Sequence, residues 1–124
     1  MKRLLLILLT AALARSIPAV ELNSLTEAAA MVPDQTWVYK TVGERELRLY
    51  AFLPENLEPT NSPSLLCVHG GGWRGGEPRQ FFPHCRYFAT RGIPAFAVEY
   101  RLVDEAAGTT IHDCLADCDD AMAY

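Results

Sequence analysis

The segment His69-Gly70-Gly71-Gly72-Trp73 is the part of this sequence whose residue types are best suited to chemistry. It directly follows residues 64–68, a continuous apolar run that is typical of a strand buried on both faces. Consecutive glycines let the backbone turn sharply and expose its N–H groups, and a fixed array of N–H groups can stabilise an oxyanion. The segment therefore predicts an anion-stabilising loop, and the competing interpretation is a tight turn between a strand and a helix.

The nucleophile that would use such a loop is missing from the sequence. The four serines are Ser16, Ser24, Ser62 and Ser64, and none of them lies in a Gly-x-Ser-x-Gly setting. We therefore expect the 124-residue chain alone to be catalytically inactive, because it has no activated serine.

The composition is that of one globular domain or part of one, because half of the residues are hydrophobic and the net charge is -4. Lysine and arginine form no cluster, which argues against a nucleic-acid partner. The spacing of the cysteines does not match a zinc site, and the acidic run of Asp117, Asp119 and Asp120 is interpreted as a solvated helix face. We expect neither a metal nor a cofactor.

The first residues have the features of a secretory signal peptide. Two basic side chains precede an apolar run over residues 4–12, and Ala12 and Ala14 place small side chains where a signal peptidase reads them. We predict a signal peptide over residues 1–14, a leader over residues 15–33, and a secreted or periplasmic protein without membrane association after cleavage. A transmembrane anchor is the alternative, but the apolar run is too short to span a bilayer comfortably.

Strands and helices alternate through the predicted domain, residues 34–124. Strands over residues 34–42 and 46–53 form an antiparallel hairpin around a Gly43-Glu44 turn, and apolar strands over 64–68 and 93–99 flank a helix over 81–91. Thr110 and Asp113 predict a capping box for a last helix that runs to Tyr124. Its apolar stripe comprises Ile111, Cys114, Leu115, Cys118 and Met122. The pattern indicates an α/β fold, with an antiparallel hairpin followed by parallel strands and flanking helices, that is incomplete.

Export would permit disulfide bonds between the four cysteines. We interpret all four as small buried hydrophobic residues without a disulfide. They are Cys67, Cys85, Cys114 and Cys118.

The order of these elements and their motifs resembles the α/β-hydrolase superfamily over residues 37–124. The resemblance rests on His69 to Trp73, on Val98-Glu99-Tyr100-Arg101-Leu102 about thirty residues later, and on the helix start after His112. The branch that it resembles comprises secreted esterases and lipases, including proteins similar to acetylxylan and feruloyl esterases.

The resemblance implies a Ser-His-Asp triad that lies beyond residue 124. It assigns the oxyanion-stabilising N–H groups to Gly71 and Gly72, and support of the loop to His69 and Gly70. Trp73 is interpreted either as part of a substrate pocket or as packing. Tyr100 and Arg101 are interpreted as a structural brace at the end of the strand over residues 93–99.

The implied function is hydrolysis of a carboxylic ester, with a small ester or an acylated polysaccharide as substrate. The alternatives are a non-catalytic binding protein with the same fold and a secreted peptidase of that fold. The resemblance also predicts that the strand over residues 93–99 lies between the hairpin and the strand over residues 64–68. The two helices should lie on opposite faces of the sheet, which keeps Cys85 too far from Cys114 and Cys118 for a disulfide.

Overall fold

The computed structural model describes residues 30–57 and 63–124 of the chain. The predicted signal peptide, the leader up to residue 29, and residues 58–62 of the loop before the apolar strand lie outside the described residues. The elements in chain order are β1 (Gln35–Val42), β2 (Arg45–Phe52), β3 (Leu65–Val68), the short 3₁₀ helix η1 (Pro78–Phe81), α2 (Phe82–Ala89), β4 (Ala95–Val98) and α3 (Ile111–Ala123).

The predicted hairpin is confirmed. Strands β1 and β2 pair antiparallel with Val42 opposite Arg45, so that Gly43 and Glu44 form the connection. Gly43 has a φ of 61°, a left-handed conformation that glycine adopts at little cost. On β2, Leu47, Leu49 and Ala51 are buried, as the alternating pattern predicts.

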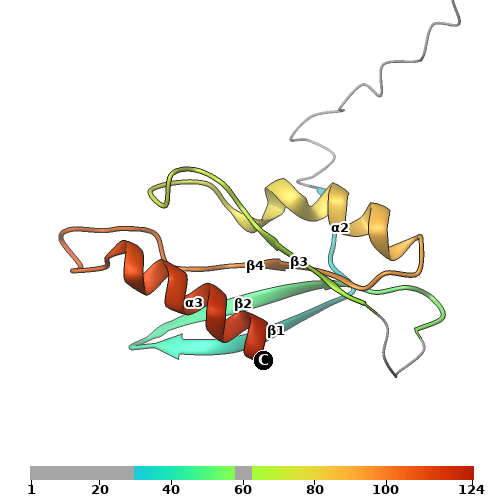
Figure 1. Cartoon of the computed structure of the whole chain (residues 1–124), viewed down its shortest axis with the longest axis horizontal. Helices are drawn as coiled ribbons and strands as arrows, with labels where there is room; N and C mark the ends of the chain where they lie inside the picture. Colours follow the sequence, from blue (N-terminus) through green and yellow to red (C-terminus); the bar gives the residue numbers. More distant parts are fainter. Residues whose placement is uncertain (1–29, 58–62) are drawn as a thin grey trace, which may run out of the picture.

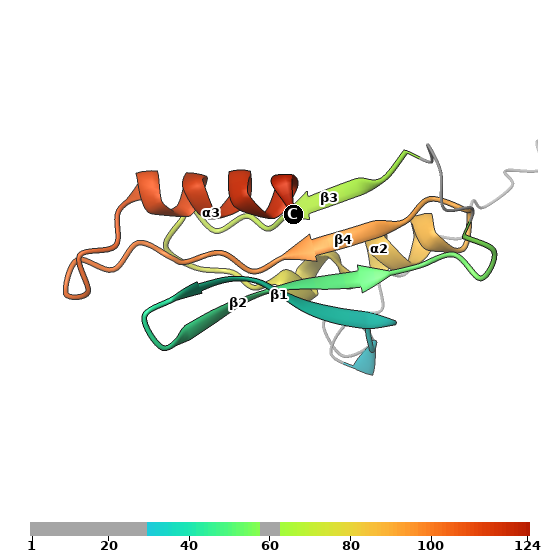
Figure 2. The same ribbon diagram turned by 90° about the horizontal axis from the view of Figure 1, so that it is seen from below.

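The four strands form one mixed sheet in the order β1-β2-β4-β3 (Figure 2). Strand β4 is antiparallel to β2 and parallel to β3. This order confirms that the strand predicted over residues 93–99 lies between the hairpin and the strand predicted over residues 64–68. Strands β3 and β4 are parallel and are connected through α2, so their carboxyl ends lie at the same edge of the sheet. The glycine-rich segment begins at this edge, directly after β3.

Helices α2 and α3 cover opposite faces of this sheet (Figure 1). Under α2, Phe52 packs against Phe82 with their rings edge to face at 5.1 Å. Under α3, Cys114, Cys118 and Ala121 pack against Leu49 and Val98. The arrangement agrees with the prediction that Cys85 lies on the other side of the sheet from Cys114 and Cys118, and all four cysteines are buried free thiols.

The buried stripe of α3 differs from the predicted one. Of the predicted apolar residues only Cys114 and Cys118 are buried, whereas Ile111, Leu115 and Met122 are exposed. Asp117 and Ala121 take the inward positions instead. The prediction is wrong because it chose the helix face by hydrophobicity alone, while an ion pair of Asp117 with Arg101, which follows β4, holds the Asp117 side chain inward.

The ends of both helices follow their sequence signals. The carboxylate of Asp113 accepts hydrogen bonds from the N–H and the hydroxyl of Thr110, both at 2.8 Å, which forms the predicted cap of α3. Helix α2 begins at Phe82 with Pro83 in its first turn and ends before Gly92, whose φ is 83°. No helix in the described residues is both long and apolar enough to cross a membrane.

Candidate active-site loop

The glycine-rich segment after β3 is a loop in an unusual backbone conformation. Gly71, Gly72 and Trp73 have φ values of 128°, 62° and 64°. The first two values suit glycine, but a positive φ is costly for a residue with a side chain, and Trp73 is the only such residue described. Strain of this kind persists only where the surroundings hold it, and it concentrates at functional sites.

A second pair of glycines, Gly75 and Gly76, lies very close to the backbone of the first glycines of the loop. A Cβ atom on Gly71 would lie 2.2 Å from the carbonyl oxygen of Gly75, and a Cβ on Gly76 would lie 2.2 Å from the carbonyl oxygen of Gly70. No residue with a side chain fits at either position without moving backbone. The sequence reasoning missed Gly75 and Gly76, although a second Gly-Gly pair four residues after the first was the available signal.

The N–H groups of Gly71 and Gly72 are free to bind a ligand. Within residues 30–57 and 63–124, neither donates a hydrogen bond, and both residues are exposed. The carbonyl oxygen of Gly71, in contrast, accepts a hydrogen bond of 3.2 Å from the N–H of Arg74, which forms a turn within the loop. A Cβ on Gly72 would meet nothing within 4 Å, so open space lies beside this residue.

His69 lies under the loop and not in the open space. Its side chain is buried, and its ring stacks on that of Tyr100 at 4.3 Å. The Nδ1 atom lies 3.0 Å from the carbonyl oxygen of Gly70 and 3.2 Å from the Tyr100 hydroxyl oxygen, so a protonated Nδ1 can donate to either. These contacts link the start of the loop to the end of β4.

Trp73 packs against the same tyrosine. Its ring meets that of Tyr100 edge to face at 5.5 Å, and its carbonyl oxygen accepts the N–H of Val103 at 2.8 Å. The half-buried ring therefore contributes to packing under α3, the second of the two interpretations of this residue.

Arg101 is held by a buried carboxylate. Asp117 is fully buried and accepts three hydrogen bonds from Arg101, from the backbone N–H at 3.0 Å and from Nε and Nη2 at 2.8 Å each. Lys40 of β1 adds an ion pair to the same carboxylate at 2.7 Å. The interpretation of Asp117 as part of a solvated acidic face is therefore wrong, while its neighbours Asp119 and Asp120 are exposed. Its spacing from Cys114 and Ala121 is that of one helix face, but the sequence does not show which side chain would compensate a buried carboxylate there.

The charged side chains around Asp117 lower the pKa of its carboxyl group. Burial acts to raise the pKa of its carboxyl group, but the hydrogen bonds from Arg101 and Lys40 outweigh burial, and the pKa lies below its usual value. The same bonds raise the pKa of Arg101 and of Lys40. All three groups are charged at neutral pH, and their contact ties β1, the end of β4 and α3 together.

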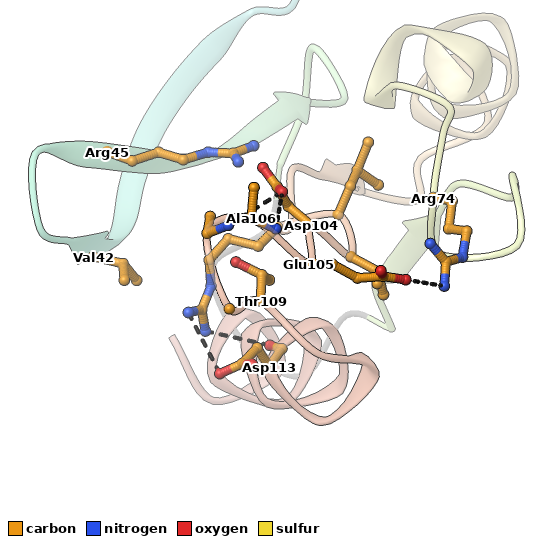
Figure 3. Close-up of a pocket in the computed structure, with 13 residues that line it drawn as sticks. Val42, Arg45, Arg74, Asp104, Glu105, Ala106, Thr109 and Asp113 are labelled. Atoms are coloured by element: carbon orange, nitrogen blue, oxygen red, sulfur yellow. Dashed lines mark hydrogen bonds and ion pairs between the residues drawn. The ribbon is translucent and has the colours of Figure 1, made fainter.

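A polar hollow of about 780 Å³ opens between the β1–β2 turn and the loop before α3 (Figure 3). Arg74 pairs there with Glu105 at 3.3 Å, and Arg101 with Asp113 at 3.5 Å. Because cationic and anionic side chains balance, the hollow offers no concentrated charge for an ionic ligand. The described residues also contain no group of three or more side chains that could hold a metal ion.

The serine that the structure describes is remote from the loop. Ser64 precedes β3, whereas the glycine loop follows the other end of that strand. The residues that the structure brings together are His69, Gly70, Gly71, Gly72, Trp73, Tyr100 and Arg101, and to these it adds Gly75, Gly76 and Asp117. Together they form a loop in which two exposed glycines, Gly71 and Gly72, have N–H groups without a hydrogen-bond partner among the described residues.

Comparison with solved structures finds an esterase. Esterase 2 of the planctomycete Thermogutta terrifontis with bound propionate matches at 39% identity with a TM-score of 0.63, over 70% of this chain and 32% of that one. Its native form matches at 35% identity and a TM-score of 0.63, over 77% and 36% of the two chains. The form phosphonylated by sarin matches at 39% identity and a TM-score of 0.63, over 70% and 32%. This chain thus spans about a third of the length of that esterase.

No family model matches the chain, and a comparison with curated proteins finds no match. The identity to the solved esterase nevertheless supports a relationship to ester-hydrolysing enzymes, and that relationship agrees with the strand order and the position of the glycine loop.

Proposed function

We propose that this chain, which has part of an α/β-hydrolase fold, is the N-terminal part of a secreted serine hydrolase that cleaves carboxylic esters. A Ser-His-Asp triad from beyond residue 124 would complete the site. The observation that carries the proposal is a pair of exposed glycines, Gly71 and Gly72, whose N–H groups have no hydrogen-bond partner among the described residues. They lie on a loop whose backbone approaches itself too closely for a side chain at Gly71 or Gly76.

In the proposed reaction the serine attacks the ester carbonyl, and its proton passes to the histidine and then to the leaving alcohol. Water then attacks the acyl-serine, which releases the carboxylic acid and restores the serine hydroxyl. The carbonyl oxygen becomes an oxyanion in the tetrahedral intermediate. The N–H groups of Gly71 and Gly72 donate to this oxygen, and their fixed positions spare the site the cost of reorganising during the reaction. Loss of one such donor typically lowers the rate by about 10²–10³.

The acyl group is proposed to be short. The similar esterase was solved with propionate and with butyrate bound, which favours esters of small aliphatic acids for this chain as well. Acetyl esters of polysaccharides are the proposed natural substrates, on the resemblance to acetylxylan esterases, and feruloyl esters of polysaccharides are the alternative.

The test compares the protein made from the whole reading frame with the 124-residue chain. We expect the whole protein to react with a fluorophosphonate probe at one serine beyond residue 124 and to hydrolyse p-nitrophenyl acetate and butyrate. The 124-residue chain should do neither. A whole protein that folds, is not labelled and hydrolyses neither ester would instead support a binding protein.

A further inference from the structure

Residues 71–74 form a tight turn whose backbone angles are unfavourable for a tryptophan. The N–H of Arg74 donates to the carbonyl oxygen of Gly71 at 3.2 Å, and the two residues between them, Gly72 and Trp73, have φ values of 62° and 64°. Two successive positive φ values are typical of a type I′ turn, in which glycine, asparagine and aspartate predominate. Trp73 therefore needs contacts from elsewhere in the chain to hold it in this conformation.

Two contacts hold Trp73, and both come from the segment that follows β4. The half-buried ring meets that of Tyr100 edge to face at 5.5 Å, as part of the hydrophobic cluster under α3. The carbonyl oxygen accepts the N–H of Val103 at 2.8 Å. Any residue at position 73 could accept this hydrogen bond, so the ring contact is what the tryptophan side chain itself contributes.

The same tyrosine also holds the start of the loop. Its ring stacks on that of His69, and its hydroxyl donates to the His69 carbonyl oxygen. Gly71 and Gly72 lie in the chain between His69 and Trp73, so both ends of the segment that carries their N–H groups are anchored on Tyr100. Loss of the contact at Trp73 would release one of these two ends.

We propose that the indole ring of Trp73 is a positioning group for the N–H groups of Gly71 and Gly72, an inference that rests on the proposed hydrolase function. The ring acts through the backbone. Packed against Tyr100, it keeps the turn at positive φ and so fixes the direction of the Gly72 N–H. Without the ring, residue 73 relaxes toward the negative φ that side chains favour, and the donor turns away from the oxyanion.

The experiment compares three substitutions of Trp73 in the protein made from the whole reading frame. Trp73→Phe keeps an aromatic ring against Tyr100, Trp73→Ala removes the ring and keeps the strain of a positive φ, and Trp73→Gly removes both. We expect Trp73→Phe to stay within a few-fold of the wild-type kcat. The other two variants should lower kcat by about 10²-fold with little change in KM, because a misplaced donor acts on the transition state.

Trp37→Ala is the matched control. Trp37 is a half-buried tryptophan of the same hydrophobic cluster, but it lies on β1, at the opposite edge of the sheet from β3, and packs against Phe96 at 6.0 Å. Trp37→Ala should unfold at a lower urea concentration than the wild type and keep its kcat.

The order of stability at position 73 separates strain from packing. Trp73→Gly should unfold at a higher urea concentration than Trp73→Ala, the reverse of the usual order of these residues, because glycine relieves the strain of a φ of 64°. A loss of kcat shared by both variants is then not explained by instability.

Amide hydrogen exchange gives a readout that does not depend on activity. The N–H groups of Arg74 and Val103, which close the turn and hold the Trp73 carbonyl, should exchange faster in Trp73→Gly than in the wild type or Trp37→Ala. An inactive wild-type protein would contradict the proposed function, and the exchange rates would still test the anchor. A Trp73→Gly enzyme with the wild-type kcat, a rise of KM alone, a Trp73→Phe enzyme as slow as Trp73→Gly, or unchanged exchange at both amides would overturn the proposal.

Discussion

The hydroxyl group of Tyr100 donates a hydrogen bond of 2.6 Å to the carbonyl oxygen of His69, 31 residues away in the sequence. The two rings also stack, so Tyr100, two residues after the end of β4, directly supports the first residue of the glycine loop. The glycine loop and the segment after β4 are therefore coupled through Tyr100 and His69, and substitution of Tyr100 should change the position of the loop.

Replacement of Tyr100 by Phe should lower kcat in the whole enzyme and destabilise it by about 1–3 kcal/mol, because the buried carbonyl of His69 would lose its partner. Tyr39→Phe is the matched control, since the Tyr39 hydroxyl also donates to a backbone carbonyl at 2.6 Å, that of Glu99. Both variants should lose stability in urea unfolding, but only Tyr100→Phe should lose kcat. Equal kcat values for the two variants would show that Tyr100 does not position the loop.

Replacement of Asp117 by Asn should destabilise the protein by about 3–5 kcal/mol, because it leaves Arg101 without its buried counter-charge. Asp119→Asn, two residues away on the exposed face of α3, should change the free energy of unfolding by less than about 0.5 kcal/mol. Urea unfolding of both variants at neutral pH measures the difference.

The Asp117 carboxyl also predicts a pH dependence. Its pKa is lower in the folded chain than its ordinary 3.8, so its contribution to stability is complete above that value and is lost as the pH falls through the lower, folded-state pKa. The wild-type protein should therefore lose more stability between neutral and acid pH than Asp117→Asn does. If the unfolding free energies of the two proteins fall by the same amount as the pH is lowered, the role of this carboxylate is contradicted.

Gly76 should tolerate no side chain. Alanine there places its Cβ 2.2 Å from the carbonyl oxygen of Gly70, in addition to the strain of a φ of 92°. Gly92→Ala is the matched control, since its φ is 83° and its Cβ would meet nothing, so only the backbone strain of about 1–2 kcal/mol applies. Thermal unfolding should show a much larger loss for Gly76→Ala, and equal losses would mean that the close approach at Gly76 is absent.

Local patterns were enough to predict the hairpin and the glycine loop. Strand alternation on β2 and Gly43 at the turn are properties of adjacent residues, and the strand order followed from the resemblance that the motifs carry. Asp117 could not be placed in the same way. A carboxylate is buried only when a partner from elsewhere in the chain compensates its charge, and Arg101 and Lys40 become its partners only in the folded sheet.

The close approach of the two glycine pairs was also beyond local reasoning. Glycines in a loop are equally consistent with flexibility, and only the fold shows that a Cβ on Gly71 or Gly76 would collide with backbone. The face that α3 buries was misjudged because cysteine, alanine and aspartate at the inward positions are no more hydrophobic than the exposed Leu115 and Met122.

The central claim, that the loop stabilises an oxyanion, is tested most directly by kcat of Gly72→Ala against Gly43→Ala in the whole enzyme. The two glycines have φ values of 62° and 61° and open space around the position of a Cβ, so alanine imposes the same backbone strain at both. We expect similar losses of stability. Alanine keeps the backbone N–H, but relaxation away from the positive φ of Gly72 would turn this N–H out of position. For Gly72→Ala alone we therefore expect kcat to fall, by up to about 10²–10³ where the donor is lost completely, with little change in KM. A Gly72→Ala enzyme that folds and keeps the kcat of Gly43→Ala would contradict the account.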